Sequence, residues 1–256
     1  VGSEMCIRDR YNKNILKIKN FLNILNIMII NDKNQNDIFD EMEIDYVFSN
    51  NPINRIHKID EQENKNQLLV DLEKKIQNIE NCELKKNAKK IVFSDGKQDS
   101  KIMIIGEGPG QKEDEQGKPF VGEAGILLNK MLMAINIKRE QVYITNVVNY
   151  RPPNNRKPEP KEVARYSEFL REHILIINPA ILVLLGSTAM EALLGYKLKI
   201  TKERGIWKEV IIKNKVYKTI VSFHPAYLLR KPEQKKFSWI DLTEIKKEID
   251  RSNIKI

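Results

Sequence analysis

Short apolar runs alternate with helical patterns from residue 101 onward, and this alternation limits the possible folds more than any other feature of the chain. Four runs rich in Ile and Val are typical of buried strands and cover residues 102–105, 142–144, 181–185 and 219–222. Apolar residues at helical spacing predict helices at 124–135, 162–177 and 187–194. This order predicts an α/β fold with a parallel sheet and helices on both faces. The alternating segment 205–217 predicts a hairpin that leads into the last strand.

The first third of the chain differs in composition, with many Asn, Lys and Ile residues. Runs such as NDKNQND and DEQENKNQ carry too few apolar side chains to pack, so we expect a disordered linker between helical patterns at 15–30 and 68–79. The opening letters VGSEMCIRDR resemble a translated sequencing adapter more than a protein segment. The sequence therefore predicts residues 1–10 of non-native origin, an N-terminal extension over 11–98 and a folded domain over 99–250.

The charge balance is basic, with 44 Lys and Arg against 35 Asp and Glu and a net charge of +9. Such an excess favours a polyanionic partner, because the partner's counterions are released on binding. An AT-rich genome would enrich Lys, Ile and Asn in the same way. The charge alone therefore leaves both explanations open.

Cysteine content and hydropathy indicate the compartment. The chain has two cysteines, Cys6 and Cys82, which argues against a disulfide framework and fits a reducing cytosol. The apolar stretch 15–30 is interrupted by Lys17 and Lys19 and predicts an amphipathic helix instead of a membrane span. No small-residue cleavage site of a signal peptide follows it. We therefore expect a cytoplasmic protein without a membrane partner.

Polar residues gather where the predicted strands end. The four ends carry Gly106-Glu107-Gly108, Thr145-Asn146, Gly186-Ser187 and Phe223-His224-Pro225. Ligands of open parallel sheets bind beyond the carboxyl ends of the strands. We therefore expect three of these ends to bring their side chains to one site.

The loop after the first strand is rich in glycine and carries Glu107, Glu113, Asp114 and Phe120. Such a loop surrounds a small planar ligand with backbone amides, carboxylates and one aromatic face. A phosphate-binding loop of the Walker type would close with Gly-Lys-Ser or Gly-Lys-Thr, whereas this one reads Gly110-Gln111-Lys112-Glu113. A dinucleotide site would place a carboxylate at the end of the next strand, where Asn146 stands. Both nucleotide interpretations are therefore disfavoured.

Three motifs, in this order, resemble those of the family 4 uracil-DNA glycosylases: GEGPGQKEDEQGKPFVG, VYITNVVNYRPPNNRKP and FHPAYLLRKP. The similarity runs from about residue 81 to residue 249. It implies the family's fold, a three-layer α/β/α sandwich around a central four-stranded parallel sheet. It also implies the activity of a base excision repair enzyme, which flips uracil out of DNA, hydrolyses its N-glycosidic bond and leaves an abasic site. We expect a monomer that associates with the nucleoid and acts on uracil in single- or double-stranded DNA.

The resemblance implies two catalytic residues. His224 would donate a hydrogen bond to uracil O2 as negative charge develops there. Glu107 would position the attacking water and stabilise the positive sugar. Related families have an aspartate where this chain has Gly108. We expect His57 and His173 to be structural, as histidines that satisfy a turn or a core.

The implied uracil-binding residues are Gly108, Glu113, Phe120 and Asn146. The Asn146 amide would accept a hydrogen bond from N3–H and donate one to O4, a pairing that cytosine cannot complete. Phe120 would stack on the base, and Glu113 would lie against its C5 edge and exclude the methyl group of thymine. The alternatives are a core aromatic residue for Phe120 and a solvated charge for Glu113.

The resemblance also implies DNA contacts. Leu228 would fill the space that the flipped base leaves, while Arg230 and Lys231 would bind phosphates. Arg151 and Arg156, in the RPPNNR loop, are secondary candidates for backbone contacts, with solubility as their alternative role.

Family 4 enzymes usually carry a [4Fe-4S] cluster on four cysteines. The matching positions here are Ile79, Cys82, Tyr150 and Tyr166, of which one is a cysteine. A single thiolate cannot hold four irons that each need a ligand. We therefore expect that no cofactor or metal is bound and that aromatic and aliphatic side chains fill the space.

Two other classes of protein remain open. One is a non-catalytic protein that binds damaged or single-stranded DNA on the same fold, and the other is a flavodoxin-like protein that binds a small molecule. Intact Glu107, Asn146 and His224 favour the enzyme. Affinity for an oligonucleotide that falls steeply with salt would separate DNA binding from small-molecule binding. The N-terminal extension could form an arm that contacts a repair or replication protein.

Overall fold

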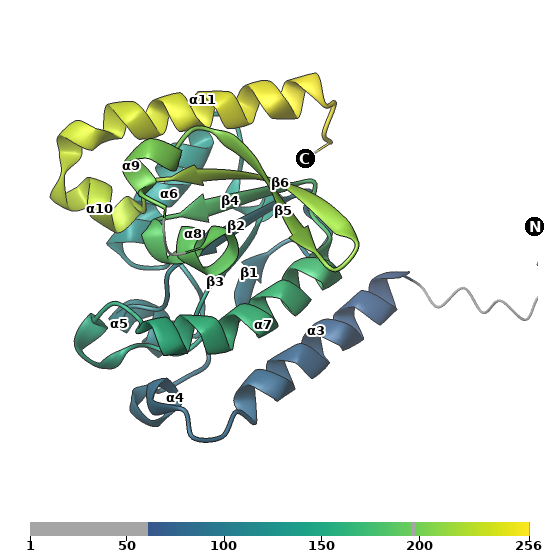
Figure 1. Cartoon of the computed structure of the whole chain (residues 1–256), viewed down its shortest axis with the longest axis vertical. Helices are drawn as coiled ribbons and strands as arrows, with labels where there is room; N and C mark the ends of the chain where they lie inside the picture. Colours follow the sequence, from purple (N-terminus) through teal and green to yellow (C-terminus); the bar gives the residue numbers. More distant parts are fainter. Residues whose placement is uncertain (1–60, 196–197, 256) are drawn as a thin grey trace, which may run out of the picture. The chain divides into compact units, whose positions relative to one another are not determined.

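The computed structural model describes residues 61–195 and 198–255, which build a six-stranded sheet (Figure 1). The strands are β1 (Ser94–Gly96), β2 (Ile102–Gly106), β3 (Tyr143–Asn146), β4 (Ile181–Leu185), β5 (Trp207–Ile212) and β6 (Lys215–Ser222). Their order across the sheet is β1-β3-β2-β4-β6-β5. The four inner strands are parallel, whereas β1 and β5 pair antiparallel to β3 and β6 at the two edges.

The predicted α/β fold with a parallel sheet is confirmed. Strands β2, β3, β4 and β6 correspond to the four predicted strands, with β3 beginning one residue later than predicted, and β5 and β6 form the predicted hairpin. The sheet has six strands instead of four because each edge gains an antiparallel strand. Strand β1 was not predicted, since its three residues, SDG, carry neither an apolar run nor an alternation.

Helices precede the first strand, connect the inner strands and follow the last strand. They are α3 (Glu61–Gln77), α4 (Glu83–Asn87), α5 (Gln111–Gln116), α6 (Glu123–Met133), α7 (Pro160–Ile177), α8 (Ser187–Leu194), α9 (Ile200–Glu203), α10 (Pro225–Arg230) and α11 (Lys235–Arg251). Short 3₁₀ turns occur at η1 (Arg139–Gln141), η2 (Pro153–Asn155) and η3 (Pro232–Gln234). The predicted helices at 68–79, 124–135, 162–177 and 187–194 correspond to α3, α6, α7 and α8.

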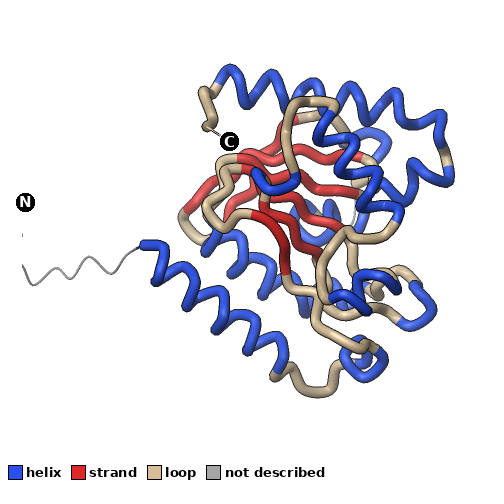
Figure 2. The backbone as a smooth tube through the Cα atoms, turned by 180° about the vertical axis from the view of Figure 1, so that it is seen from behind, coloured by secondary structure: helices blue, strands red, loops and turns tan. Residues whose placement is uncertain are grey.

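Successive side chains of the inner strands pack on opposite faces of the sheet. Ile102 and Ile104 of β2 belong to a core that α6 and α11 complete. Met103 and Ile105 belong to a second core with α3, α7 and α8. Figures 1 and 2 show these helices on either side of the strands. Because both faces are covered, the inner strands are continuous apolar runs, as expected of a buried parallel sheet.

The predicted domain boundary at residue 99 lies inside this unit. Helix α3 buries Leu69, Leu72 and Ile76 in the core beside α7, and β1 extends the sheet next to β3. The boundary is therefore corrected to include residues 61–98. Composition was misleading here because the apolar stripe of α3 is embedded among many Lys, Asn and Gln residues. The predictions for residues 1–10 and for a helix at 15–30, together with His57 and Cys6, lie outside the described residues. The predicted disordered linker lies outside them up to residue 60, but it is wrong for residues 61–67, which form the first turns of α3.

Among residues 61–195 and 198–255, no helix combines the length and the apolar character that a bilayer span requires.

Candidate active site

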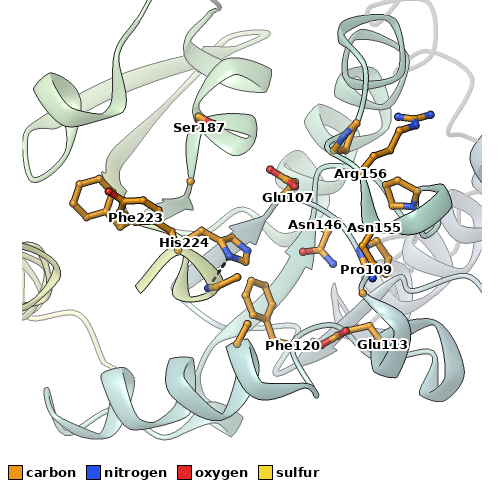
Figure 3. Close-up of a pocket in the computed structure, with 18 of the residues that line it drawn as sticks. Glu107, Pro109, Glu113, Phe120, Asn146, Asn155, Arg156, Ser187, Phe223 and His224 are labelled. Carbon is orange, nitrogen blue, oxygen red and sulfur yellow. Dashed lines mark hydrogen bonds between the residues drawn. The ribbon is translucent and has the colours of Figure 1, made fainter. Parts of the chain in front are cut away.

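A pocket of about 500 Å³ lies at the carboxyl ends of the inner strands (Figure 3). Glu107 follows β2, Asn146 ends β3, Gly186 follows β4 and His224 follows β6, and all four residues line it. The strands are parallel and adjacent, so their ends meet at one edge of the sheet. The structure thus brings together all four of the strand ends at which the sequence places polar residues.

Asn146 contributes a buried amide to this pocket. Its side chain is 2% exposed, and its Oδ1 has no hydrogen-bond partner among the described residues. Gly106 makes room for it, because a Cβ at Gly106 would lie 2.4 Å from that oxygen and 2.5 Å from the Phe120 ring. A buried acceptor without a partner costs about 1–3 kcal/mol, so the oxygen is ready for a donor that a ligand supplies.

His224 caps the first turn of α10. Its Nδ1 accepts a hydrogen bond from the Ala226 backbone N–H at 3.2 Å, which Figure 3 draws as a dashed line. In a neutral imidazole, the other nitrogen then carries the hydrogen, so Nε2 is a donor. The ring points toward the space between Glu107, Asn146 and Phe120 (Figure 3).

The surroundings of His224 keep it neutral. Burial, with the positive charge of Arg230 adding to it, lowers the pKa of His224 to about 4. Gly186 allows the close approach: its φ is +94°, and a Cβ there would lie 3.1 Å from the His224 Cβ. At neutral pH the pocket therefore contains an uncharged hydrogen-bond donor.

Phe120 forms one wall of the pocket with a backbone in the left-handed region, at φ 52°. Its ring stacks on His224 with centroids 5.4 Å apart. Arg139 holds this backbone from outside, donating to the Phe120 carbonyl at 3.0 Å and to the Pro119 carbonyl at 2.7 Å. Few non-glycine residues adopt this φ without such support, so the aromatic wall is held rigidly. The ring is 5% exposed and also belongs to the core. Phe120 is therefore both a wall of the pocket and a core aromatic residue.

Glu113 lines the pocket and ties the same loop. Its Oε1 accepts hydrogen bonds from the backbone N–H groups of Val121 and Gly122, at 3.0 and 2.8 Å. The side chain is 9% exposed, which rules out the alternative of a solvated surface charge. Gly110 accommodates it, because a Cβ at Gly110 would lie 2.8 Å from Oε2.

Glu107 and Gly108 follow β2 at the floor of the pocket. The Thr188 hydroxyl donates to Glu107 Oε2 at 2.5 Å. Gly108 lines the pocket without a side chain, and a Cβ there would lie 2.7 Å from Val148 Cγ2. An aspartate at position 108 would therefore collide with the buried side chain of Val148.

The predicted DNA contacts separate into two groups. Arg230 and Lys231 are exposed at the end of α10, and neither has an ion-pair partner in the described part of the chain. Arg156 instead donates two hydrogen bonds to the Glu162 carboxylate, at 2.8 and 2.7 Å, and Arg151 donates to Asn155 Oδ1 at 2.7 Å. The charge of Arg156 is thus already compensated, which makes it a poor candidate for a phosphate contact.

The prediction for Leu228 needs a correction. Leu228 is 1% exposed and packs in the core that α6 and α11 share, whereas Leu229 is 40% exposed. A side chain that fills the space of a flipped base must project from the protein surface into the DNA. Leu228 would have to leave the core, so the neighbouring Leu229 is the better candidate.

The four positions that match the family's cluster ligands lie in the same hydrophobic core. Ile79, Cys82, Tyr150 and Tyr166 are all buried in the core with α3, α7 and α8, and Cys82 Sγ lies 3.4 Å from the Tyr166 hydroxyl. Burial raises the pKa of both tyrosine hydroxyls, so they stay protonated and cannot replace thiolates. Among the described residues no group of three or more metal-ligating side chains occurs. This donor set does not fit a [4Fe-4S] cluster.

Sequence reasoning did not identify Thr188 or Arg139. Thr188 follows directly after the strand end Gly186-Ser187, so its place in the chain was a usable signal. Arg139 lies in a polar connection with no motif, and its contacts to residues 119 and 120 exist only in the folded chain.

The fold and its edge pocket define an α/β protein with a ligand-sized pocket at the carboxyl ends of its parallel strands, and residues 93–243 match the model of the uracil DNA glycosylase superfamily. Three relatives are named type-4 uracil-DNA glycosylases. The protein from Thermotoga maritima is 48% identical over 150 residues, which cover 58% of this chain and 77% of the relative. Those from Archaeoglobus fulgidus and Pyrobaculum aerophilum are 38% and 37% identical over 169 and 168 residues, covering 64% of this chain and 85% and 86% of the relatives. The chain belongs to the type-4 uracil-DNA glycosylase family, which confirms the resemblance seen in the motifs.

Proposed function

We propose that the pocket of this chain binds uracil flipped out of DNA and that Glu107 and His224 promote hydrolysis of its N-glycosidic bond. As a member of its family, the chain is a uracil-DNA glycosylase, a hydrolase of DNA repair. The observation that carries the assignment of the pocket is the unpartnered Oδ1 of Asn146. Uracil N3–H is a donor of the kind that this buried oxygen lacks.

Asn146 accounts for the choice of base. Its Oδ1 would accept from N3–H while its Nδ2 donates to O4, and cytosine has an acceptor at N3 and an amino donor at C4 instead. Cytosine would leave polar atoms unpaired inside the pocket, which costs about 1–3 kcal/mol for each. Glu113 is proposed to lie against the C5 edge, where it would exclude the methyl group of thymine.

His224 and Glu107 act on the two charges that develop as the bond breaks. Uracil leaves as an anion, and the Nε2–H donor of neutral His224 would stabilise the charge on O2. The sugar becomes positive, and the Glu107 carboxylate would stabilise it and orient the attacking water. Phe120, stacked on His224, would hold the base by its face.

Extrusion of the base brings DNA to the rim of the pocket. We propose that Leu229, rather than Leu228, occupies the vacated stack, supported by its exposed fraction of 40%. Arg230 and Lys231 would bind the flanking phosphates. The support for DNA contacts beside the reacting bond is that these three residues follow His224 within seven positions of the chain.

The experiment that tests this proposal uses a uracil-containing oligonucleotide, followed by alkali cleavage at abasic sites. We expect the parent to cleave it and Glu107→Ala to be slower by about 10²–10⁴-fold, since the variant loses the carboxylate that orients water. Glu115→Ala is the matched control, because Glu115 pairs with Lys89 at the surface and does not line the pocket. Parental activity in Glu107→Ala would contradict the catalytic assignment, and an inactive parent would contradict the function.

We also propose that this chain works without the iron–sulfur cluster for which its family is known. The support is the chemistry of the matching positions, which supply one thiol, two protonated phenols and an isoleucine. Protein purified without oxygen should contain no iron or sulfide above background. A chelator should leave its activity unchanged. Cys82→Ala should keep uracil excision while losing about 1–2 kcal/mol of folding stability with the buried thiol. About four irons per chain, lost in Cys82→Ala, would contradict the proposal.

A further inference from the structure

We infer that Thr188 is a positioning residue for Glu107: its hydroxyl fixes one carboxylate oxygen, so that the other faces the water and the sugar. The inference rests on the proposed role of Glu107. Thr188 Oγ1 donates to Glu107 Oε2 at 2.5 Å, while Glu107 Oε1 has no hydrogen-bond partner in the described part of the chain. One oxygen is thus held and the other is available.

The topology brings these two residues together across 81 positions of sequence. Strands β2 and β4 are parallel neighbours, with Ile105 opposite Leu184. Glu107 follows the first of these strands, and Thr188 is the second residue of α8, which begins directly after the second. The pairing of β2 with β4 therefore brings the backbone of Glu107 beside the first turn of α8, within reach of the Thr188 hydroxyl.

Thr188 is suited to hold a side chain in one direction. It is 0% exposed, so water does not compete for its hydroxyl. Threonine has two favoured χ1 rotamers in a helix, and the hydrogen bond to Glu107 is made in the one that the structure shows. A Glu side chain, by contrast, has three rotatable bonds, and an unrestrained carboxylate would spend little time in the productive orientation.

The geometry of the pocket explains why the orientation of the Glu107 carboxylate matters. Glu107, Asn146 and His224 point into the same space from three strand ends (Figure 3). The amide and the imidazole are fixed by their strand end and by the Ala226 N–H, so the base would be bound in one place. The water must then arrive from one direction relative to the sugar, and a carboxylate held by Thr188 defines that direction.

The test compares Thr188→Val, which keeps the shape without the hydroxyl, with Thr188→Ser, which keeps the hydroxyl. Thr188→Val should lower kcat about 10- to 100-fold and change KM less than about threefold, because the lost bond acts on the carboxylate and not on base binding. Thr188→Ser should return kcat to within about threefold of the parent. Thr219→Val is the matched control, since it removes another fully buried hydroxyl, bonded to the Tyr217 carbonyl, away from the pocket.

A double-variant comparison separates positioning from a merely structural role. In a Glu107→Ala background, Thr188→Val should cause no further loss of the single-turnover rate, because no carboxylate remains to be positioned. Equal losses in both backgrounds, or a parental kcat in Thr188→Val, would overturn the inference. If Thr188→Val melts below the assay temperature, the smaller Thr188→Ala gives the same comparison. If the parent excises uracil and Thr188→Val is equally active, this inference alone is refuted. If the parent is inactive, the proposed function is refuted as well.

Discussion

Replacing Asn146 with leucine is expected to lower kcat/KM for uracil excision by about 10⁴-fold, the factor by which a site built to hydrogen-bond its substrate discriminates against an unbonded one. The physical reason is the buried Oδ1, which has no partner in the free protein and gains one when uracil N3–H arrives. Thermal stability should be unchanged or higher in the same variant, because folding leaves that oxygen unpaired. Single-turnover cleavage and a thermal melt measure the two quantities.

Asn149→Leu is the matched control for this prediction. Asn149 is a buried amide three residues later, and its Nδ2 donates to the Val92 carbonyl at 3.1 Å, inside the protein. Its replacement should destabilise the fold by about 1–3 kcal/mol and leave kcat/KM within a few-fold of the parent. A stable Asn146→Leu variant that cleaves at the parental rate would show that the free oxygen does not recognise the base.

Loss of the imidazole should be the second large effect, with His224→Ala reducing kcat by about 10²–10³-fold. His224 supplies a neutral Nε2–H donor because its Nδ1 is bonded to Ala226 N–H and burial keeps its pKa near 4. A histidine of ordinary pKa would give the rate an inflection at about pH 6.5, whereas here the rate should stay level from about pH 5.5 to 8. Kinetics across this range and a nitrogen NMR titration of the imidazole would measure both.

His173→Gln is the control for the histidine prediction. His173 is fully buried away from the pocket, with Nε2 at 2.8 Å from the Tyr143 hydroxyl and its ring stacked on Phe93. Its replacement should lower thermal stability and leave kcat near the parental value. A His224 pKa above about 6, or a proton on its Nδ1, would contradict the donor role.

The same low pKa values predict how stability depends on pH. Burial lowers the pKa of His173 to about 3 and that of His224 to about 4, below the ordinary value of 6.5. The unfolded chain therefore binds more protons than the folded chain between these values and pH 6.5. The stabilising contribution of the two neutral rings is complete above about pH 6.5 and is lost as the pH falls toward 4 and then 3.

Local sequence patterns were sufficient to predict the inner strands of the sheet, but they did not reveal the edge strand β1. Strands β2 and β4 are covered by helices on both faces, so each is an unbroken run of apolar residues. Strand β1 contacts one neighbour only and has three residues without such a pattern. The prediction for Leu228 met a similar limit, because the six residues of α10 are too few for their pattern to show that Leu228 faces the core.

The sequence by itself determined which chemical groups the pocket contains, because each of them follows a strand that its own residues specify. Glu107, Asn146 and His224 could be named from three short motifs for this reason. Tertiary structure alone decided which atoms of these and other residues are free and which are already bonded. Asn146 Oδ1 is unpaired, the Arg156 guanidinium is bound by Glu162, and Thr188 holds Glu107 across 81 positions. Hydrogen bonds depend on neighbours that are distant in the chain, and the folding of the sheet is what brings those neighbours together.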